Sequence, residues 1–276
     1  MPEKFFLMTA HHKKDDYIDI SKKYFDPIQV GGALTDTDLG IVTDASGENI
    51  SAKNRSYCEL TAYYWAWKNC DAEYIGLMHY RRIFTVKPFL KQRISNTISF
   101  LSRVIRYGIK GGGAELCLSR RIKAKQSDAE ELSAGLKAFI MGADFDMILP
   151  KKQYYHHVTM EENYCMVHNR EDFDIMKKAV SGMYPDMTAA MGKCVRSNSF
   201  YSYNMMIMKK DLYQKYCEML FSVLADVESR INISDRSDYQ KRVFGFLSER
   251  MLNFFVQHMK DTQNIKIIEL DAVFLK

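Results

Sequence analysis

One stretch of the chain, Thr43–Arg82, most constrains what the protein can fold into. It begins as a polar loop that contains Asp44 and Asn49, and continues as an aromatic-rich segment, about 51–69, that is typical of a helix. It then enters the apolar run Tyr74–Met78, which indicates a buried parallel strand because it is too apolar for a sheet edge. A loop, a helix and a buried strand in this order predict half of a nucleotide-binding α/β unit.

The predicted strand ends on a cluster of hydrogen-bonding and cationic side chains, His79-Tyr80-Arg81-Arg82. Ligands of open α/β sheets bind beyond the carboxyl ends of the strands, so we expect this cluster at a ligand site. One arginine at a strand end is often paired with a carboxylate. Two adjacent arginines favour a phosphate clamp, because guanidinium groups match phosphate oxygens bidentately.

Size and composition are those of a folded protein: 276 residues, 47% hydrophobic, are enough for one α/β domain that spans 1–276. A formal charge of +5 suits an anionic ligand or membrane surface, and is too small and dispersed to predict nucleic acid as a partner. Six scattered cysteines without a CxxC pair predict reduced thiols in a cytoplasmic protein. No apolar run is long enough to span a bilayer, so we expect a soluble or peripheral protein.

Hydrophobic periodicity predicts alternating strands and helices, and hence an α/β fold with a mostly parallel sheet flanked by helices. The predicted strands are 4–10, 74–78, 146–150, 199–208 and 265–270, and the predicted helices are 15–25, 51–69, 127–142, 170–180, 211–230 and 237–259.

The segment 87–126 differs from the rest of the chain, because its ten lysines and arginines are accompanied by a single acid, Glu115. Apolar residues recur in it at helical spacing: Phe89, Ile94, Ile98, Leu101 and Ile105. We expect a basic amphipathic helix inserted in the domain. Such a helix often lies on an anionic membrane surface; the alternative is an insertion packed on the domain with its charges in water.

Six blocks of the chain occur in an order that resembles a known family. They are PIQVGGAL (27–34), TDASGENISAKNRSYCELTAYYWAWKN (43–69), YIGLMHYRRIF (74–84), DMILPKK (146–152), YNMMIMKKDL (203–212) and DYQKRVFGFLSERMLNFF (238–255). Together they resemble a family of bacterial glycosyltransferases of capsular and exopolysaccharide synthesis, first catalogued as a domain of unknown function. The segment 87–126 departs from this pattern, because family members usually have a shorter link there.

The resemblance implies a GT-A-like, Rossmann-type fold and the transfer of a sugar from a nucleotide-diphosphate donor, a UDP-sugar. Its implied acceptor is an oligosaccharide on a polyprenyl diphosphate at the inner membrane surface. The family includes galactofuranose transferases, so galactose or galactofuranose is a candidate sugar here, and the resemblance leaves its identity open. Retention or inversion of the anomeric configuration is left open as well. Two alternative functions remain open: a sugar-phosphate transferase, and a non-catalytic module that binds anionic glycans or lipid carriers.

GT-A enzymes normally place an Asp-x-Asp after a buried strand to hold a divalent metal on the diphosphate. Here the corresponding strand ends in His79-Tyr80-Arg81-Arg82, without a carboxylate. We therefore assign no metal ligands and expect cationic side chains to take the place of Mn²⁺ or Mg²⁺, with metal dependence left open.

We assign roles to single residues from their order in the chain and from the chemistry of their side chains. Glu249 is the candidate catalytic base, with Asp238 as the second candidate; the alternative for Glu249 is an ion pair with Arg242 or Arg250. His79, Arg81 and Arg82 are assigned to the diphosphate or sugar, with His79 also a catalytic candidate. Tyr203, Asn204 and Arg242 are assigned to the acceptor. The residues assigned to the nucleotide and ribose are His12, Gln29, Val30, Gly31, Asp44, Asn49, Lys53 and Asn54.

Overall fold

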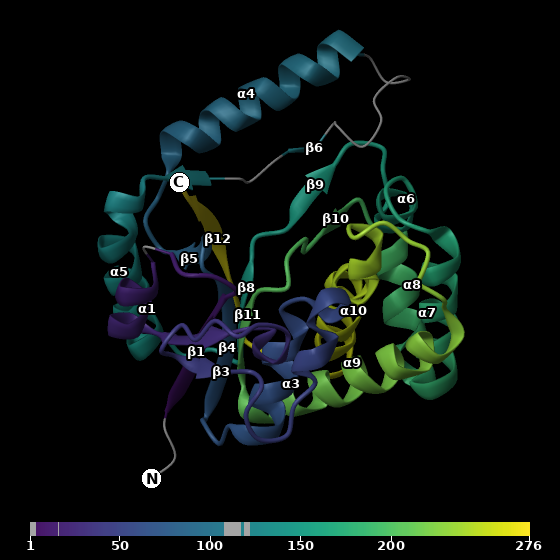
Figure 1. The fold of residues 1–276 in the computed structure, drawn as a ribbon. Helices are drawn as coiled ribbons and strands as arrows, with labels where there is room; N and C mark the ends of the chain where they lie inside the picture. Colours follow the sequence, from purple (N-terminus) through teal and green to yellow (C-terminus); the bar gives the residue numbers. More distant parts are fainter. Residues whose placement is uncertain (1–3, 16, 108–116, 119–121) are drawn as a thin grey trace.

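The protein has a mixed α/β fold, seen in a computed structural model that describes residues 4–15, 17–107, 117–118 and 122–276 (Figure 1). The strands within these ranges are β1 (Phe5–His11), β2 (Asp26–Gln29), β3 (Val42–Thr43), β4 (Tyr74–His79), β5 (Arg82–Thr85), β6 (Cys117–Leu118), β7 (Ile122–Ala124), β8 (Met147–Pro150), β9 (Gln153–Tyr155), β10 (Ser199–Phe200), β11 (Met206–Lys209) and β12 (Ile267–Leu275).

Helices connect and cover these strands. The α-helices are α1 (Ile18–Tyr24), α2 (Asn54–Tyr57), α3 (Leu60–Asn69), α4 (Leu90–Tyr107), α5 (Ala129–Gly142), α6 (Met160–Cys165), α7 (Arg170–Met183), α8 (Thr188–Val195), α9 (Lys210–Arg230) and α10 (Val243–Thr262). The short 3-10 turns are η1 (Gly32–Leu34), η2 (Ser51–Lys53), η3 (Gln126–Asp128), η4 (Pro185–Met187) and η5 (Gln240–Arg242).

The large sheet is mixed. Strands β3, β2, β1 and β4 are parallel neighbours, and β12 is parallel to β8 and β7. By contrast, β5 runs antiparallel to β4 and β12, and β11 runs antiparallel to β4 and β8. The mostly parallel, Rossmann-type sheet expected from the sequence is therefore not confirmed. A second, small antiparallel sheet has the order β10-β9-β6.

Two apolar cores lie on opposite faces of the large sheet (Figure 1). On one face α1 and α5 pack through residues such as Leu132 and Leu136, and on the other α3, α9 and α10 pack through residues such as Tyr63 and Phe254. Gly76 of β4 permits close packing of strands, because a Cβ atom there would lie 2.7 Å from Cγ1 of Ile207 on β11. Strand β4 is thus packed between a helical layer on each face of the sheet, and this packing fixes the position of its carboxyl end.

The predicted elements are mostly found, with two corrections. The helix expected over 51–69 is broken, because Cys58 adopts a positive φ of 53° between α2 and α3. The strand expected over 199–208 is split into β10 and β11, which belong to different sheets. Close tertiary packing accompanies the helix break: α10 approaches α2 so closely that a Cβ atom on Gly245 would lie 3.3 Å from Sγ of Cys58.

The part of the basic insertion 87–126 that includes Leu90–Tyr107 forms α4, which stands off from the body of the fold at the end of the molecule away from the N-terminus (Figure 1). Residues 108–116 and 119–121 of the insertion lie outside the described residues. Its base is held by an ion pair between Arg93 and Asp271 of β12 and by hydrogen bonds between Gln92 and the backbone of Lys123. Within the part of the chain that the structure describes, no helix is both long and apolar enough to span a membrane.

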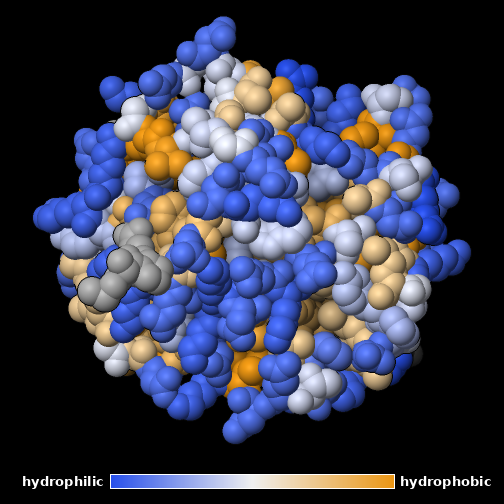
Figure 2. Space-filling model, turned by 90° about the horizontal axis from the view of Figure 1, so that it is seen from below, coloured by the Kyte–Doolittle hydropathy of each residue, from blue (hydrophilic) through white to orange (hydrophobic). Residues whose placement is uncertain are grey.

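The two ends of the molecule differ in surface character. On the face opposite α4, hydrophobic side chains form small, separate groups among hydrophilic ones, as Figure 2 shows, which is usual for a protein surface. The apolar residues of α4 instead form one row with the exposed members Leu90, Ile94, Ile98, Leu101 and Ile105, of which Ile105 is 82% exposed.

Candidate functional site

A cavity of about 500 Å³ opens where β1, β2 and β4 end; we call it the donor pocket after the nucleotide-sugar donor expected from the sequence. Strand β4 turns into β5 through Tyr80 and Arg81, and this tight hairpin forms one wall. The residues that line the pocket are Ala10, His12, Val30, Asn54, Arg55, Cys58, Glu59, His79, Arg81, Arg82 and Arg242. Because several carboxyl strand ends meet there, the pocket occupies the position in which α/β sheets bind ligands.

The polar loop at 44–51 holds the rim of the donor pocket through a buried carboxylate. Asp44 is fully buried and accepts hydrogen bonds from the backbone N–H groups of Gly31 and Gly32, at 2.8 and 3.0 Å, and from the Ser51 hydroxyl. Gly31 has a left-handed φ of 71°, which glycine adopts without strain. Asp44 therefore acts by positioning Val30 and the start of α2, since its own side chain is fully buried.

Arginine side chains supply the positive charge of the pocket. The guanidinium of Arg82 lies over the rings of Tyr203 and Phe274, with its carbon 4.0 and 4.4 Å from their centroids. Arg81 is exposed and lies over Tyr80, 4.8 Å from its centroid. Arg242 reaches the pocket from η5 and donates from Nε to Sγ of Cys58 at 3.2 Å. Together with Arg55, these side chains give the pocket four cations.

The two histidines of the pocket are neutral at physiological pH. Burial, together with the charges of Arg82 and Arg81, lowers the pKa of His79 to about 3. Burial also lowers the pKa of His12, together with the charges of Lys13 and Arg81. His79 Nδ1 accepts a hydrogen bond from the backbone N–H of Arg81 at 3.3 Å, which leaves Nε2 as the donor. The positive charge that the sequence suggested for this cluster therefore comes from the arginines.

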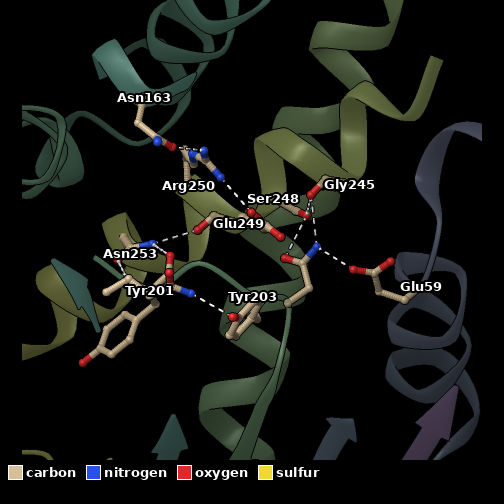
Figure 3. Close-up of polar contacts among 11 residues, drawn as sticks. Glu59, Asn163, Tyr201, Tyr203, Gly245, Ser248, Glu249, Arg250 and Asn253 are labelled. Carbon is tan, nitrogen blue, oxygen red and sulfur yellow. Dashed lines mark hydrogen bonds and ion pairs between the residues drawn. The ribbon is translucent and has the colours of Figure 1, made fainter. Parts of the chain in front are cut away.

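Glu59 is the carboxylate among the described residues that line the pocket. Its Oε1 accepts a hydrogen bond from Asn204 Nδ2 at 2.9 Å, and the same amide donates to the carbonyl of Gly245 at 3.0 Å. Ser248 donates to the Asn204 carbonyl oxygen at 3.0 Å. As Figure 3 shows, this network ties Glu59 of the α2–α3 corner to the first turns of α10.

Glu249 lies on the same stretch of α10, next to this network (Figure 3). It accepts a hydrogen bond from Arg250 at 2.7 Å, and Arg250 also donates to Asn163 at 2.9 Å. Burial raises the pKa of Glu249 to about 7; the charge of Arg250 opposes this rise, and that of Glu59 adds to it. The side chain remains 24% exposed. A partly accessible carboxyl group that titrates near neutrality has the property that a general base requires.

The structure gathers some predicted site residues in the donor pocket and places others elsewhere. Seven of them line it: His12, Val30, Asn54, His79, Arg81, Arg82 and Arg242. Asn204 does not line the pocket but donates a hydrogen bond to Glu59, which does. The Tyr203 ring packs against the guanidinium group of Arg82, another lining residue. Three residues expected at the nucleotide have other contacts: Gln29 bonds the backbone of Thr37 and Leu39, Asn49 bonds the carbonyl groups of Ala45 and Gly47, and Lys53 pairs with Glu228 at 2.7 Å. Asp238 is exposed in the turn before η5.

Sequence reasoning missed Arg55, Cys58 and Glu59, which also line the pocket. Their signal was their proximity to Asn54 at the start of the predicted helix: Cys58 lies one helical turn after it. Among the residues that the structure describes, no group of three or more His, Cys, Asp or Glu side chains is placed to hold a metal ion. Four arginines and one carboxylate make the pocket suited to an anionic ligand such as a diphosphate.

Known proteins that resemble this chain include a solved structure and a sequence family. The fold is similar to that of a protein titled "WbbM bifunctional glycosytransferase apo structure", with a TM-score of 0.79 and 26% sequence identity. The match covers 100% of this chain, which spans 46% of that protein's chain. No curated protein matches the sequence. The profile of the family described as "Domain of unknown function (DUF4422)" matches residues 6–261, and the chain therefore belongs to this family.

Proposed function

We propose that the protein is a glycosyltransferase that moves a sugar from a nucleoside-diphosphate donor to an acceptor hydroxyl. The observation that carries the proposal is the donor pocket, in which four arginines and the carboxylate of Glu59 meet at the carboxyl ends of three strands. The similarity of the whole chain to part of a bifunctional glycosyltransferase supports it.

The arginines fit the leaving group of such a reaction. Glycosyl transfer releases a nucleoside diphosphate, and groups that stabilise its developing charge lower the barrier. Guanidinium groups bind phosphate oxygens bidentately and keep their charge at any physiological pH. Neutral His79 contributes a hydrogen-bond donor without adding charge, since its pKa lies near 3.

Two carboxyl groups are candidates for the base that takes the proton of the acceptor hydroxyl. Glu249 has the suitable pKa, about 7, whereas Glu59 has the suitable position, since it lines the pocket. We propose Glu249 as the base and Glu59 as a hydrogen-bonding partner of the sugar. If the transfer inverts the anomeric centre, this base acts directly on the acceptor.

We further propose that the arginines, in place of a bound divalent cation, meet most of the diphosphate charge. Turnover is then expected to survive EDTA. Complete loss with EDTA that Mn²⁺ restores would contradict this part of the proposal and leave the transferase activity itself intact.

Donor binding is tested by the thermal stability of the protein in the presence of nucleotide sugars. A ligand at 100 times its dissociation constant stabilises the native state by about 2.7 kcal/mol, so UDP-galactose and UDP-galactofuranose are expected to raise the Tm if the donor is a UDP-sugar. The double variant Arg55→Ser/Arg242→Ser is expected to lose this rise. Arg230→Ser removes an exposed arginine at the end of α9 and serves as the matched control.

The outcomes separate the competing functions. A protein whose Tm no nucleotide sugar changes, and which hydrolyses none, is instead a binding module for anionic glycans or lipid carriers. A product that retains the sugar phosphate identifies a sugar-phosphate transferase. A product with a new glycosidic bond and a released nucleoside diphosphate supports the glycosyltransferase.

The finer proposal is that the acceptor is a lipid-linked oligosaccharide of capsular or exopolysaccharide synthesis, reached at the inner face of the plasma membrane. Helix α4 supports it. Its protein-facing side carries the buried Phe100 and the anchoring Arg93, and the exposed apolar row lies away from them around the helix. Lys91 and Arg106 are exposed near the two ends of that row, and exposed basic residues are typical of helices that lie on anionic lipid.

Vesicle co-sedimentation tests the role of α4. Ile98→Ser/Ile105→Ser is expected to reduce binding to phosphatidylglycerol vesicles and to leave the Tm nearly unchanged, because both side chains are at least 61% exposed. Met141→Ser/Met183→Ser removes two exposed apolar side chains elsewhere and is the control. Equal vesicle binding by both variants would contradict a membrane role for α4.

A further inference from the structure

A second cleft lies on the other side of the β4–β5 hairpin from the donor pocket. Its volume is about 380 Å³. The residues that line it are Lys13, Lys14, Asp15, Tyr17, Tyr80, Arg81, Gln126, Leu275 and Lys276. Arg81 lines both cavities, so the hairpin forms a ridge with a basic side chain that is available to each.

The charge balance of the second cleft favours an anion. Asp15 is already engaged: its Oδ2 contacts His11 Nδ1 at 2.8 Å, and its Oδ1 accepts from the backbone N–H of Tyr17 at 2.9 Å. Lys13 and Lys14 are exposed at the mouth, close to Arg81. Four basic side chains, those of Lys13, Lys14, Arg81 and Lys276, thus line the cleft with one acidic side chain, Asp15, whose two oxygens both have partners. A phosphate group would balance this excess of positive charge.

A polar group in the wall of the second cleft, the Tyr80 hydroxyl, also favours a bound ligand. The Tyr80 hydroxyl is buried and has no hydrogen-bond partner among the described residues. A buried hydroxyl without a partner is costly and uncommon, and such groups are often satisfied by a water or a ligand. Tyr80 is also the residue whose ring supports the Arg81 guanidinium, so a ligand that engages this wall acts on the ridge itself.

The second cleft lies close to the base of α4. Gln92, in the first turn of α4, bonds the backbone of Lys123 in β7 at 2.7 and 2.9 Å. Strand β7 leads directly to Gln126, which lines the cleft. The second cleft is therefore joined through β7 to the base of the helix that we propose lies on a lipid surface.

We propose that the second cleft binds a phosphate group borne by a lipid, and that this phosphate belongs to the acceptor. Lys13 and Lys14 hold the phosphate, and Arg81 on the ridge faces both this phosphate and the diphosphate of the donor. Identification of the ligand as the acceptor rests on the proposed transferase function; binding of a lipid phosphate in the cleft does not.

The test compares full-length wild-type protein with Lys13→Ser/Lys14→Ser on phosphatidylcholine vesicles that contain phosphatidic acid. A lysine near an anionic lipid surface contributes about 1 kcal/mol, so two are expected to weaken binding about 30-fold. Lys178→Ser/Lys215→Ser removes the same charge from exposed positions on α7 and α9 and is expected to have less than about a threefold effect. A parallel titration uses inorganic pyrophosphate while a nucleoside diphosphate saturates the donor pocket.

Each result decides the matter. Selective weakening by Lys13→Ser/Lys14→Ser in both titrations supports a cleft that holds the phosphate of a lipid, and weakening with pyrophosphate alone overturns the lipid part. Weakening on vesicles alone shows that the two lysines attract the lipid surface without holding a phosphate in the cleft, which overturns the site. Equal weakening by the two double variants, or none by either, overturns the site. Binding of UDP-sugars is measured separately: its absence would refute the proposed function while leaving selective lipid-phosphate binding in place.

Discussion

Replacing Glu249 by glutamine changes how the stability of the protein depends on pH. The pKa of this carboxyl group rises from 4.5 to about 7 on folding, chiefly through burial. Between these values the folded state binds more protons than the unfolded state, so the free energy of unfolding falls as the pH rises through this window. Below the window Glu249 is protonated in both states. Above it, the ionised side chain makes the protein about 3 kcal/mol less stable than a permanently neutral one would.

Urea unfolding of wild type and Glu249→Gln at several pH values measures this difference. Glutamine keeps an oxygen that can accept from Arg250 and does not titrate. The stability of the variant relative to wild type is therefore expected to increase by roughly 2–3 kcal/mol between about pH 5 and pH 8. Glu218→Gln, at an exposed position of α9, is the control and is expected to show no such trend.

A relative stability of Glu249→Gln that stays constant across this pH range would refute the raised pKa. The kinetic consequence is tested on the same variant. Turnover of the wild type is expected to rise with pH through about 7 as Glu249 ionises, whereas Glu249→Gln is expected to be slow at every pH. Near-normal turnover by the variant would remove Glu249 from the mechanism even if the stability result holds.

Three further substitutions test other parts of the structure. Arg236→Met removes the bidentate partner of a buried aspartate and is expected to cost about 3–5 kcal/mol in urea unfolding, whereas Arg230→Met, at an exposed pair, costs less than about 1 kcal/mol. Gly31→Ala is expected to destabilise by about 1–3 kcal/mol because of its left-handed φ, whereas Gly182→Ala, in open space on α7, gains up to about 1 kcal/mol in the same assay. Glu59→Gln is expected to lower turnover at least about tenfold while binding of the nucleoside diphosphate, followed by calorimetry, is retained. Normal turnover would exclude Glu59 from the reaction.

The sequence by itself determined the local elements and one half of the candidate site. The apolar run at 74–78 and the apolar periodicity at 90–105 each set a local structure, since side-chain period and length distinguish strand from helix. The charged cluster His79–Arg82 follows its strand directly, so its place at a carboxyl strand end could be inferred from chain order. The exposed row of α4 was likewise readable, because residues spaced by three and four share a helix face.

Tertiary structure alone decided what meets this cluster and in which protonation state. Arg242 is distant in sequence from Cys58, and only the packing of α10 against α2 brings them to 3.2 Å. The same close approach accompanies the break of the predicted helix at Cys58, which places Glu59 in the pocket. Burial makes His79 neutral and raises the pKa of Glu249, and burial depends on every layer of the fold. The antiparallel course of β5 and β11 was also hidden, because strand direction depends on partners that a local pattern does not specify.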